Sequence, residues 1–128
     1  MHAFKMAALG LLAMAAAIAL PAAARAAQPF DAATFQQDQA AGKSIVVHVT
    51  APWCPVCAKQ RPIIRRVEAA QPALTVFDVD FDHDQAALRR FNVQSQSTII
   101  VYKGKAELGR STGETDAGRI RALIAKAM

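Results

Sequence analysis

The only two cysteines of the chain, Cys54 and Cys57, lie between an apolar run at residues 45–49 and a segment of helical periodicity at residues 58–70. Both thiols would therefore lie in a short passage from a buried strand into a helix. A Cys-x-x-Cys motif in this context is typical of a redox site, whose thiols exchange with a disulfide. A structural bridge is less favoured, because so small a loop constrains the unfolded chain little.

The motif predicts different roles for its two sulfurs. Cys54 would lie at the helix N-terminus, where unpaired N–H groups and the positive end of the macrodipole favour an anion and so lower the pKa of the thiol. Pro55 suits the first turn, because its fixed φ is helical and its missing N–H would be unpaired there. Cys57 follows about one turn later. We therefore expect Cys54 to be the attacking thiol and Cys57 the resolving one.

The rest of the chain alternates helix and strand patterns. Asp31 as N-cap and Gly42 as stop predict a first helix that ends near residue 41. Pro62 should kink the helix after the motif or start a new segment. Further strands and helices are predicted from periodicity, the strands at 44–50, 74–81, 97–102 and 106–111, the helices at 84–91 and from 115 or 116 onward. This order predicts an α/β fold, a four-stranded mixed sheet flanked by helices on both faces.

The first 26 residues have the pattern of an export signal. One positive charge, Lys5, precedes an uninterrupted apolar or small run at residues 6–20, and Ala24-Arg25-Ala26 matches a cleavage site. The run is short for a membrane span, which needs roughly 20 residues. We expect a cleaved signal peptide at 1–26, a single domain at 27–128 and a periplasmic location; the alternative is an uncleaved anchor.

The charge balance of the predicted domain is mild. The net charge of the chain is +5, and it falls to +3 when Lys5 and Arg25 leave with the signal. The basic pairs at residues 65–66 and 89–90 have no interleaved aromatic residues, which favours solvated helix faces over a nucleic-acid track. We expect a monomer with no nucleic-acid partner.

Several segments resemble the thioredoxin family, specifically its exported bacterial thiol-disulfide oxidoreductases. They are Trp53-Cys54-Pro55-Val56-Cys57, Pro62 five residues after the second cysteine, and residues 91–104, which lead from a loop into a strand. The expected element order agrees over nearly all of residues 30–128. The resemblance implies a thioredoxin fold and a protein-disulfide oxidoreductase. It further implies that the redox-active Cys54–Cys57 disulfide serves in place of a cofactor.

The resemblance also implies substrates, partners and contact residues. Substrates would be protein disulfides, and a membrane partner would supply electrons. No bound metal is expected. Substrate contacts would come from two segments, the motif residues Trp53, Pro55 and Val56 and the facing loop at Gln96, Ser97 and Thr98.

Two positions depart from the family's usual pattern. Ser97 stands where a cis-proline is usual, and since a cis peptide without proline costs about 3–4 kcal/mol, we expect a trans bond before it. His48 stands six residues before Cys54, where a buried acid is frequent. It would act as a general base for Cys57, directly or through water, or would be a core histidine held by a backbone hydrogen bond. Both readings of His48 stay open.

The direction of exchange is weakly indicated. The dipeptide Pro55-Val56 supplies no imidazole to stabilise the Cys54 thiolate further, which favours a reductase over a disulfide-forming oxidant. An exported chaperone that holds Cu(I) through both thiolates is a rival from another class. A third possibility is a redox-inert partner protein with the same fold.

Overall fold

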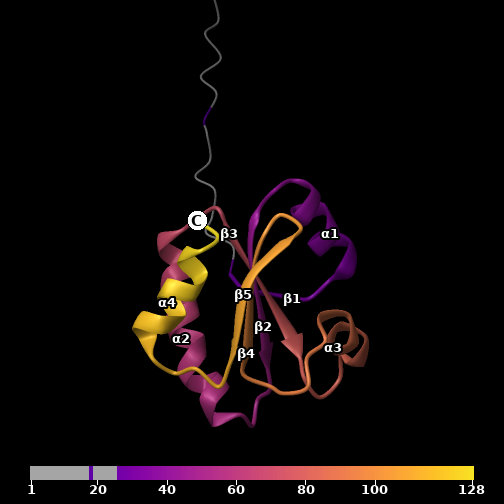
Figure 1. Ribbon diagram of the computed structural model, residues 1–128, viewed down its shortest axis with the longest axis vertical. Coiled ribbons are helices and arrows are strands. Elements are labelled where there is room, and N and C mark those ends of the chain that lie inside the picture. Colours follow the sequence, from indigo (N-terminus) through magenta and orange to yellow (C-terminus); the bar gives the residue numbers. More distant parts are fainter. Residues whose placement is uncertain (1–17, 19–25) are drawn as a thin grey trace, which may run out of the picture.

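The computed structural model describes residue 18 and residues 26–128 (Figure 1). Apart from residues 18 and 26, the predicted signal peptide lies outside this description. Within the described part of the chain, no helix combines the length and apolarity that a membrane crossing requires.

Nine elements follow one another along the chain. They are β1 (Gln28–Pro29), α1 (Ala32–Ala40), β2 (Ser44–Thr50), α2 (Pro55–Ala70), β3 (Leu74–Asp80), α3 (Gln85–Phe91), β4 (Thr98–Lys103), β5 (Ala106–Thr112) and α4 (Ala117–Ala125). Aspartates cap three of the helices, since Asp31, Asp84 and Asp116 each accept a hydrogen bond from a backbone N–H of the first turn. The predicted positions of these elements are confirmed to within about two residues at most ends.

The strands form one mixed sheet in the order β1-β3-β2-β4-β5. β2 pairs in parallel with β3 and antiparallel with β4, so it lies at the centre of the sheet. Its residues 44–49 are all buried, as the continuous apolar run predicts for a strand covered on both faces. The segment that follows β2 holds both cysteines. It therefore begins where this central strand ends.

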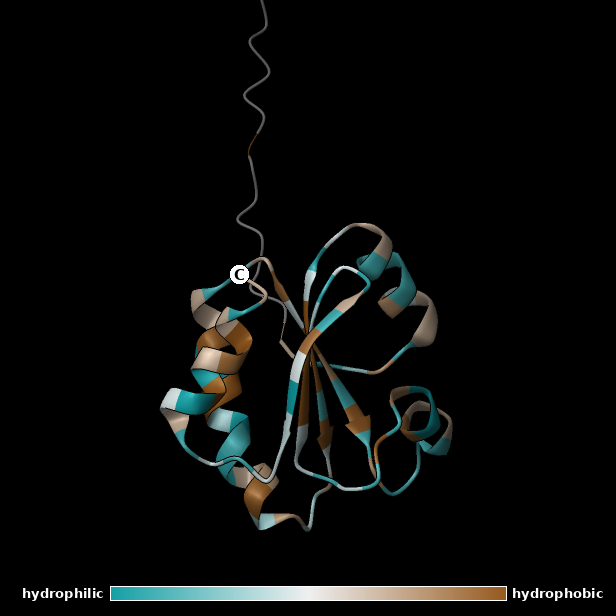
Figure 2. Cartoon of the chain, viewed as in Figure 1, coloured by the Kyte–Doolittle hydropathy of each residue, from teal (hydrophilic) through white to brown (hydrophobic). Residues whose placement is uncertain are grey.

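Two helices cover each face of the sheet (Figure 1). Phe35 of α1 and Phe91 of α3 pack on one face with Val47, Phe77 and other buried residues. The opposite core is built from Ile64 of α2, Ile120 and Ile124 of α4, and apolar side chains of the strands. Figure 2 shows the apolar residues concentrated in the strands and on the inner sides of the helices, as a two-sided α/β core requires.

The predicted four-stranded sheet is corrected to five strands by β1. This strand pairs with β3, and the N–H of Phe30 donates to the carbonyl of Asp78 at 2.8 Å. The Phe30 ring packs against those of Phe35, Phe77 and Phe91 at centroid distances of 5.6, 6.0 and 5.1 Å, which anchors the segment. Two residues are too few for a strand pattern to be visible in the sequence.

The expectation that Pro62 starts a new segment is wrong, because α2 continues without interruption from Pro55 to Ala70. Pro62 is exposed, and its missing N–H removes a single bond of the helix ladder. Buried residues before and after it, Gln60 and Ile64, hold the two halves of the helix against the sheet.

Candidate active site

Cys54 and Cys57 are joined by a disulfide at the N-terminus of α2. Cys54 is the N-cap residue, and its Sγ accepts a hydrogen bond from the N–H of Cys57 at 3.1 Å. Pro55 is the first helical residue, as predicted. The sulfurs are nearly inaccessible, since Cys54 is 3% and Cys57 0% exposed. The bridge thus lies where a helix end presents N–H groups to a developing thiolate.

Trp53 forms an exposed wall beside the disulfide. Its indole is 57% exposed and packs edge-on against Phe81, with the ring centroids 6.5 Å apart. Its Nε1–H donates to Oδ2 of Asp82 at 2.8 Å. Phe81 packs in turn against the cluster formed by Ala51 and the two cysteines. Trp53 therefore borders the surroundings of the disulfide, with its ring held by Phe81 and Asp82, which follow β3.

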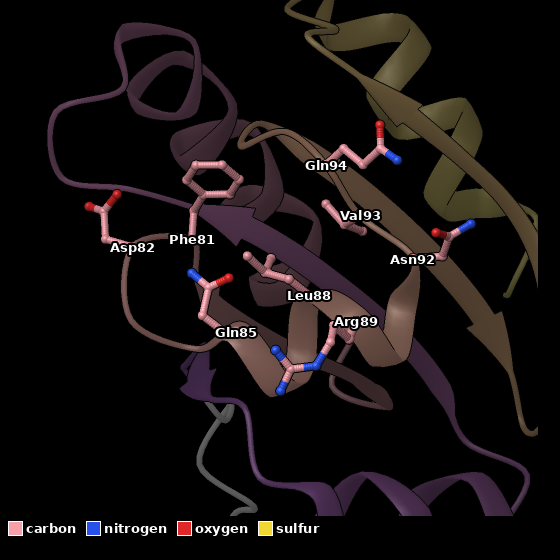
Figure 3. A pocket seen from close by; sticks show the side chains of 8 residues that line it. All are labelled: Phe81, Asp82, Gln85, Leu88, Arg89, Asn92, Val93 and Gln94. Atoms are coloured by element: carbon pink, nitrogen blue, oxygen red, sulfur yellow. The ribbon is translucent and has the colours of Figure 1, made fainter.

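A groove of about 560 Å³ begins at this wall. Figure 3 shows its lining, which comes from the segment after β3, from α3 and from the loop after α3: Phe81, Asp82, Gln85, Leu88, Arg89, Asn92, Val93 and Gln94. Phe81 and Asp82 therefore belong both to the groove and to the surroundings of Trp53. Phe81 also packs against the cluster that contains the two cysteines, so the groove adjoins the surroundings of the disulfide.

The charged rim near Trp53 contains one further pair. Nδ1 of His83 lies 3.0 Å from Oδ2 of Asp80. This hydrogen bond raises the pKa of His83 above its ordinary value and lowers that of Asp80. Both side chains are exposed, so water screens the pair.

The loop that faces the disulfide is trans at every described peptide bond, as expected for Gln96–Ser97. Ser97 has φ of +59°, in the left-handed region. Its N–H donates to the carbonyl of Val49 at 2.8 Å, and Cys57 Sγ lies 4.0 Å from the same oxygen. The shared carbonyl places the Ser97 loop directly beside the resolving cysteine.

The other predicted contact residues lie around this loop. Gln96 is half-buried, and Thr98 is buried and donates from Oγ1 to the carbonyl of Ser95 at 2.9 Å. On the motif side, Pro55 is exposed and Val56 is half-buried. Pro55, and in part Gln96 and Val56, are thus reachable from solvent, whereas Ser97 and Thr98 are buried.

His48 is buried, with 1% of its surface exposed, on the face of the sheet that α2 covers. Its Nε2 lies 2.9 Å from Oε1 of Gln60, and its Nδ1 lies 3.7 Å from Oδ1 of Asp78 on β3. Among the described residues, the side-chain hydrogen bond of His48 is the one to Gln60; Asp78 lies beyond hydrogen-bond distance, and no bond runs to Cys57. A side chain, rather than the backbone, therefore holds the imidazole.

Gln60 and Asp78 are residues of this site that the sequence analysis missed. Of the apolar residues of α2, Ile64 is buried but Ile63 and Val67 are only half-buried, whereas the polar Gln60 and Glu68 are both buried. Their spacing from Cys57 and Ile64, three or four residues, is the signal that could have found them. Asp78 follows from strand pairing, because it is the partner of His48 across β2 and β3.

Among the described residues, no group of three or more histidine, cysteine, aspartate or glutamate side chains is arranged to hold a metal ion. What the arrangement offers chemically is a reducible disulfide at a helix end, a facing backbone segment and an adjacent groove. These are the parts that thiol–disulfide exchange with an extended chain needs.

Comparison with known proteins agrees with this geometry. A family model described as Thioredoxin matches residues 26–126. The thioredoxin of Chlamydia muridarum is 30% identical over 89 residues, which cover 70% of this chain and 87% of that protein. The thioredoxin of Chlamydia trachomatis is 29% identical with the same coverage.

Solved structures give the same result. Trxlp from Edwardsiella tarda is 40% identical with a TM-score of 0.74, covering 77% of this chain and 98% of that one. The thioredoxin of Fasciola hepatica has a TM-score of 0.70 at 23% identity, covering 80% of this chain and 100% of that one, and is similar in fold.

Proposed function

The chain belongs to the thioredoxin family and is a thioredoxin-like disulfide oxidoreductase, and we propose that it acts in the periplasm as a reductase of protein disulfides. The observation that carries the reaction is the Cys54–Cys57 disulfide at the start of α2, with the Cys57 N–H directed at Cys54 Sγ at 3.1 Å. That N–H would stabilise a thiolate on Cys54 once the bridge is reduced.

The proposed reaction proceeds in two exchanges. The Cys54 thiolate attacks one sulfur of a substrate disulfide; a new S–S bond forms, and the first substrate thiolate leaves and takes a proton from water. Cys57 then loses its proton and attacks Cys54 Sγ, which releases the second substrate thiolate and restores the Cys54–Cys57 bridge. Two electrons pass to the substrate, which is reduced, while the protein is oxidised.

The substrate would bind as an extended chain beside the disulfide. The Trp53 wall and the groove of Figure 3 offer one side, and the backbone of residues 96–98 offers the other. Backbone hydrogen bonds to such a loop give affinity that does not depend strongly on substrate sequence.

His48 is proposed as the acceptor of the Cys57 proton. The nucleophile of the second exchange must be a thiolate, and His48 is a buried base on the sheet beneath α2. Because its hydrogen bonds run to Gln60, with Asp78 nearby, we place a water molecule between Cys57 and the imidazole in this step.

The periplasmic location rests on the signal-like pattern of residues 1–26, and the direction on the dipeptide between the cysteines. A reductase leaves each cycle oxidised. In an oxidising compartment it must be reduced again by a dithiol donor, for which we propose a membrane electron-transfer protein.

The test is a trapping experiment in a bacterial cell that exports the full chain. Cys57→Ser removes the resolving thiol, so we expect mixed disulfides on Cys54 that run as adducts on non-reducing gels and disappear with reductant. Mass spectrometry of the periplasmic fraction would identify the substrates, and the N-terminus of the captured protein would show whether cleavage precedes Ala27.

The matched control is the Cys54→Ser, Cys57→Ser double variant, which should form no adducts. If Cys57→Ser forms none while Cys54 is readily alkylated, the exchange reaction is refuted. Direction is read from the reduction potential of the wild-type pair. A value below that of the glutathione couple supports a reductase, and one well above it assigns the opposite direction.

A further inference from the structure

The inward side of α2 is unusually polar for a helix packed on a sheet. Its buried residues are Cys57, Gln60, Ile64 and Glu68, of which only Ile64 is aliphatic. Gln60 has no exposed surface. A buried amide is stable only when its donors and acceptor are all satisfied, and its partners therefore indicate what this side chain holds in place.

All of the polar atoms of Gln60 have partners. Nε2 donates to the carbonyl of Ser97 at 3.0 Å and to that of Glu114 at 2.9 Å, which uses both amide hydrogens. Oε1 is the remaining acceptor, 2.9 Å from His48 Nε2. The opposite orientation of the amide would set its oxygen against two carbonyl oxygens, so the two carbonyls fix which end faces the histidine.

This orientation assigns the tautomer of His48. Because Oε1 of Gln60 can only accept, Nε2 of His48 must carry a hydrogen. In the neutral ring the lone pair is then on Nδ1, and a proton taken up by the ring binds there. Oδ1 of Asp78, 3.7 Å away, would be the counter-ion of the protonated ring.

The surroundings of the ring contain few other charges. Asp78 faces it from β3, and Glu68 of α2 is close enough to Asp78 for the two carboxylates to interact. From β4 the residue opposite His48 is the apolar Ile99. The Asp78 side chain is 35% exposed, whereas Gln60 has no exposed surface, so of these two neighbours of the ring only the carboxylate beside Nδ1 reaches solvent.

We propose that Gln60 is a positioning residue that keeps a hydrogen on His48 Nε2, so that His48 gains and loses its proton at Nδ1, beside Asp78. The same amide holds the Ser97 carbonyl, so it connects this proton site to the loop that faces the disulfide. The link to catalysis rests on the proposed exchange function. The assignment of the His48 tautomer does not depend on that function.

The test reads the His48 ring directly by NMR, through nitrogen–hydrogen correlations over several bonds, in exported protein purified from cells that express the full chain. His83→Gln assigns the signals. In the wild type we expect the neutral ring to carry its hydrogen on Nε2 and a lone pair on Nδ1. A ring that titrates at Nε2, or that keeps both hydrogens wherever the protein is folded, overturns the proposal.

Gln60→Met tests the cause, because it removes the acceptor and both donors while keeping a long side chain. We expect the neutral ring to move its hydrogen to Nδ1, toward Asp78. Gln60→Glu keeps an acceptor and, with its second oxygen protonated to donate to the Ser97 or Glu114 carbonyl, should keep the hydrogen on Nε2. Ile64→Val, on the same buried side of α2, controls for loosened packing and should leave the ring signals unchanged. An unchanged tautomer in Gln60→Met overturns the positioning role.

The functional half is read from the second exchange, the resolution of a preformed mixed disulfide on Cys54. Gln60→Met should slow it by roughly tenfold, less than the 10²–10⁴ of a directly bonded general base, and Ile64→Val should not. An altered tautomer with an unchanged resolving rate overturns the link to catalysis. A wild type that forms no mixed disulfide refutes the proposed function and leaves the tautomer result standing.

Discussion

Replacing Ser97 by proline, the family's usual residue at this position, should destabilise this protein. Proline removes the N–H that donates to the carbonyl of Val49 at 2.8 Å, and a buried carbonyl without its donor costs about 1–3 kcal/mol. Proline also fixes φ near −65°, whereas Ser97 is at +59°, so the backbone must rotate. The bonds that the Ser97 carbonyl accepts from Gln60 and Gly113, both 3.0 Å, are then displaced.

Each displaced bond contributes about 0.5–1.5 kcal/mol, which brings the expected loss for Ser97→Pro to about 2–6 kcal/mol. Urea unfolding of the oxidised protein, followed by circular dichroism, measures it. With a slope of about 1–3 kcal/mol per M, the midpoint should fall by at least about 0.7 M.

The matched control is Ser97→Gly, which keeps the N–H and accepts positive φ freely. It relieves a strain of about 1–2 kcal/mol in the left-handed region and loses about 0.4–1 kcal/mol to the greater entropy of the unfolded chain. We expect it to be equal to or slightly more stable than the wild type. A proline variant with an unchanged midpoint, or a glycine variant that is clearly weaker, would refute the account of this loop.

Three further predictions concern other positions. Burial, and then the Glu107 carboxylate, raises the pKa of Tyr102, the only tyrosine, from 10.0 to about 12. Since the fold favours the neutral phenol, stability should be lost as pH rises from 10 toward 12. An ultraviolet titration that shows Tyr102 ionising near pH 10 in the folded protein would contradict this prediction. Burial raises the pKa of Glu68, so the fold disfavours its ionised form. At pH 7 Glu68→Gln should therefore unfold at higher urea than the wild type, and this difference should shrink as pH falls through the pKa of folded Glu68. A difference that does not depend on pH would contradict the prediction. Trp53→Phe removes the bond to Asp82 and should slow insulin reduction, while the rate with a small aromatic disulfide is kept and stability changes by no more than about 0.5 kcal/mol. An equal loss of rate with both substrates would argue against a role of Trp53 in substrate docking.

Most of the fold was predictable because local signals and tertiary packing agree. The strand at Ser44–Thr50 was predicted with its observed bounds, because a short continuous apolar run among alternating helices and strands is typical of a strand buried on both faces. β1 was not predictable from local pattern, because its two residues are held by the Phe30 ring and by pairing with β3. Of the two outcomes predicted for Pro62, the new segment is wrong, because the packing of α2 outweighs the loss of one helical hydrogen bond.

In the candidate site, the placement of the cysteines was predictable from the sequence, whereas the buried polar residues of α2 were not. The Cys-x-x-Cys spacing and the position of Pro55 place the sulfurs at the helix end without reference to anything distant in sequence. Gln60 was hidden because a polar residue on a helix is ordinarily assigned to solvent. Its spacing from Cys57 and Ile64 places it on the buried side of α2, but the partners that satisfy it lie 12, 37 and 54 residues away.

The two departures from the family's usual pattern, at His48 and Ser97, form one structural unit. Gln60 bonds to both, with Oε1 at the His48 ring and Nε2 at the Ser97 carbonyl. That carbonyl is held in place by the positive φ of Ser97, a conformation that proline cannot adopt. With a hydrogen on Nε2, His48 needs an acceptor, which the Gln60 amide of α2 supplies. The two N–H donors of that amide need carbonyl acceptors, and the Ser97 loop provides one of these carbonyls. The residue at the loop and the base beneath α2 therefore constrain each other, although 49 positions of sequence separate them.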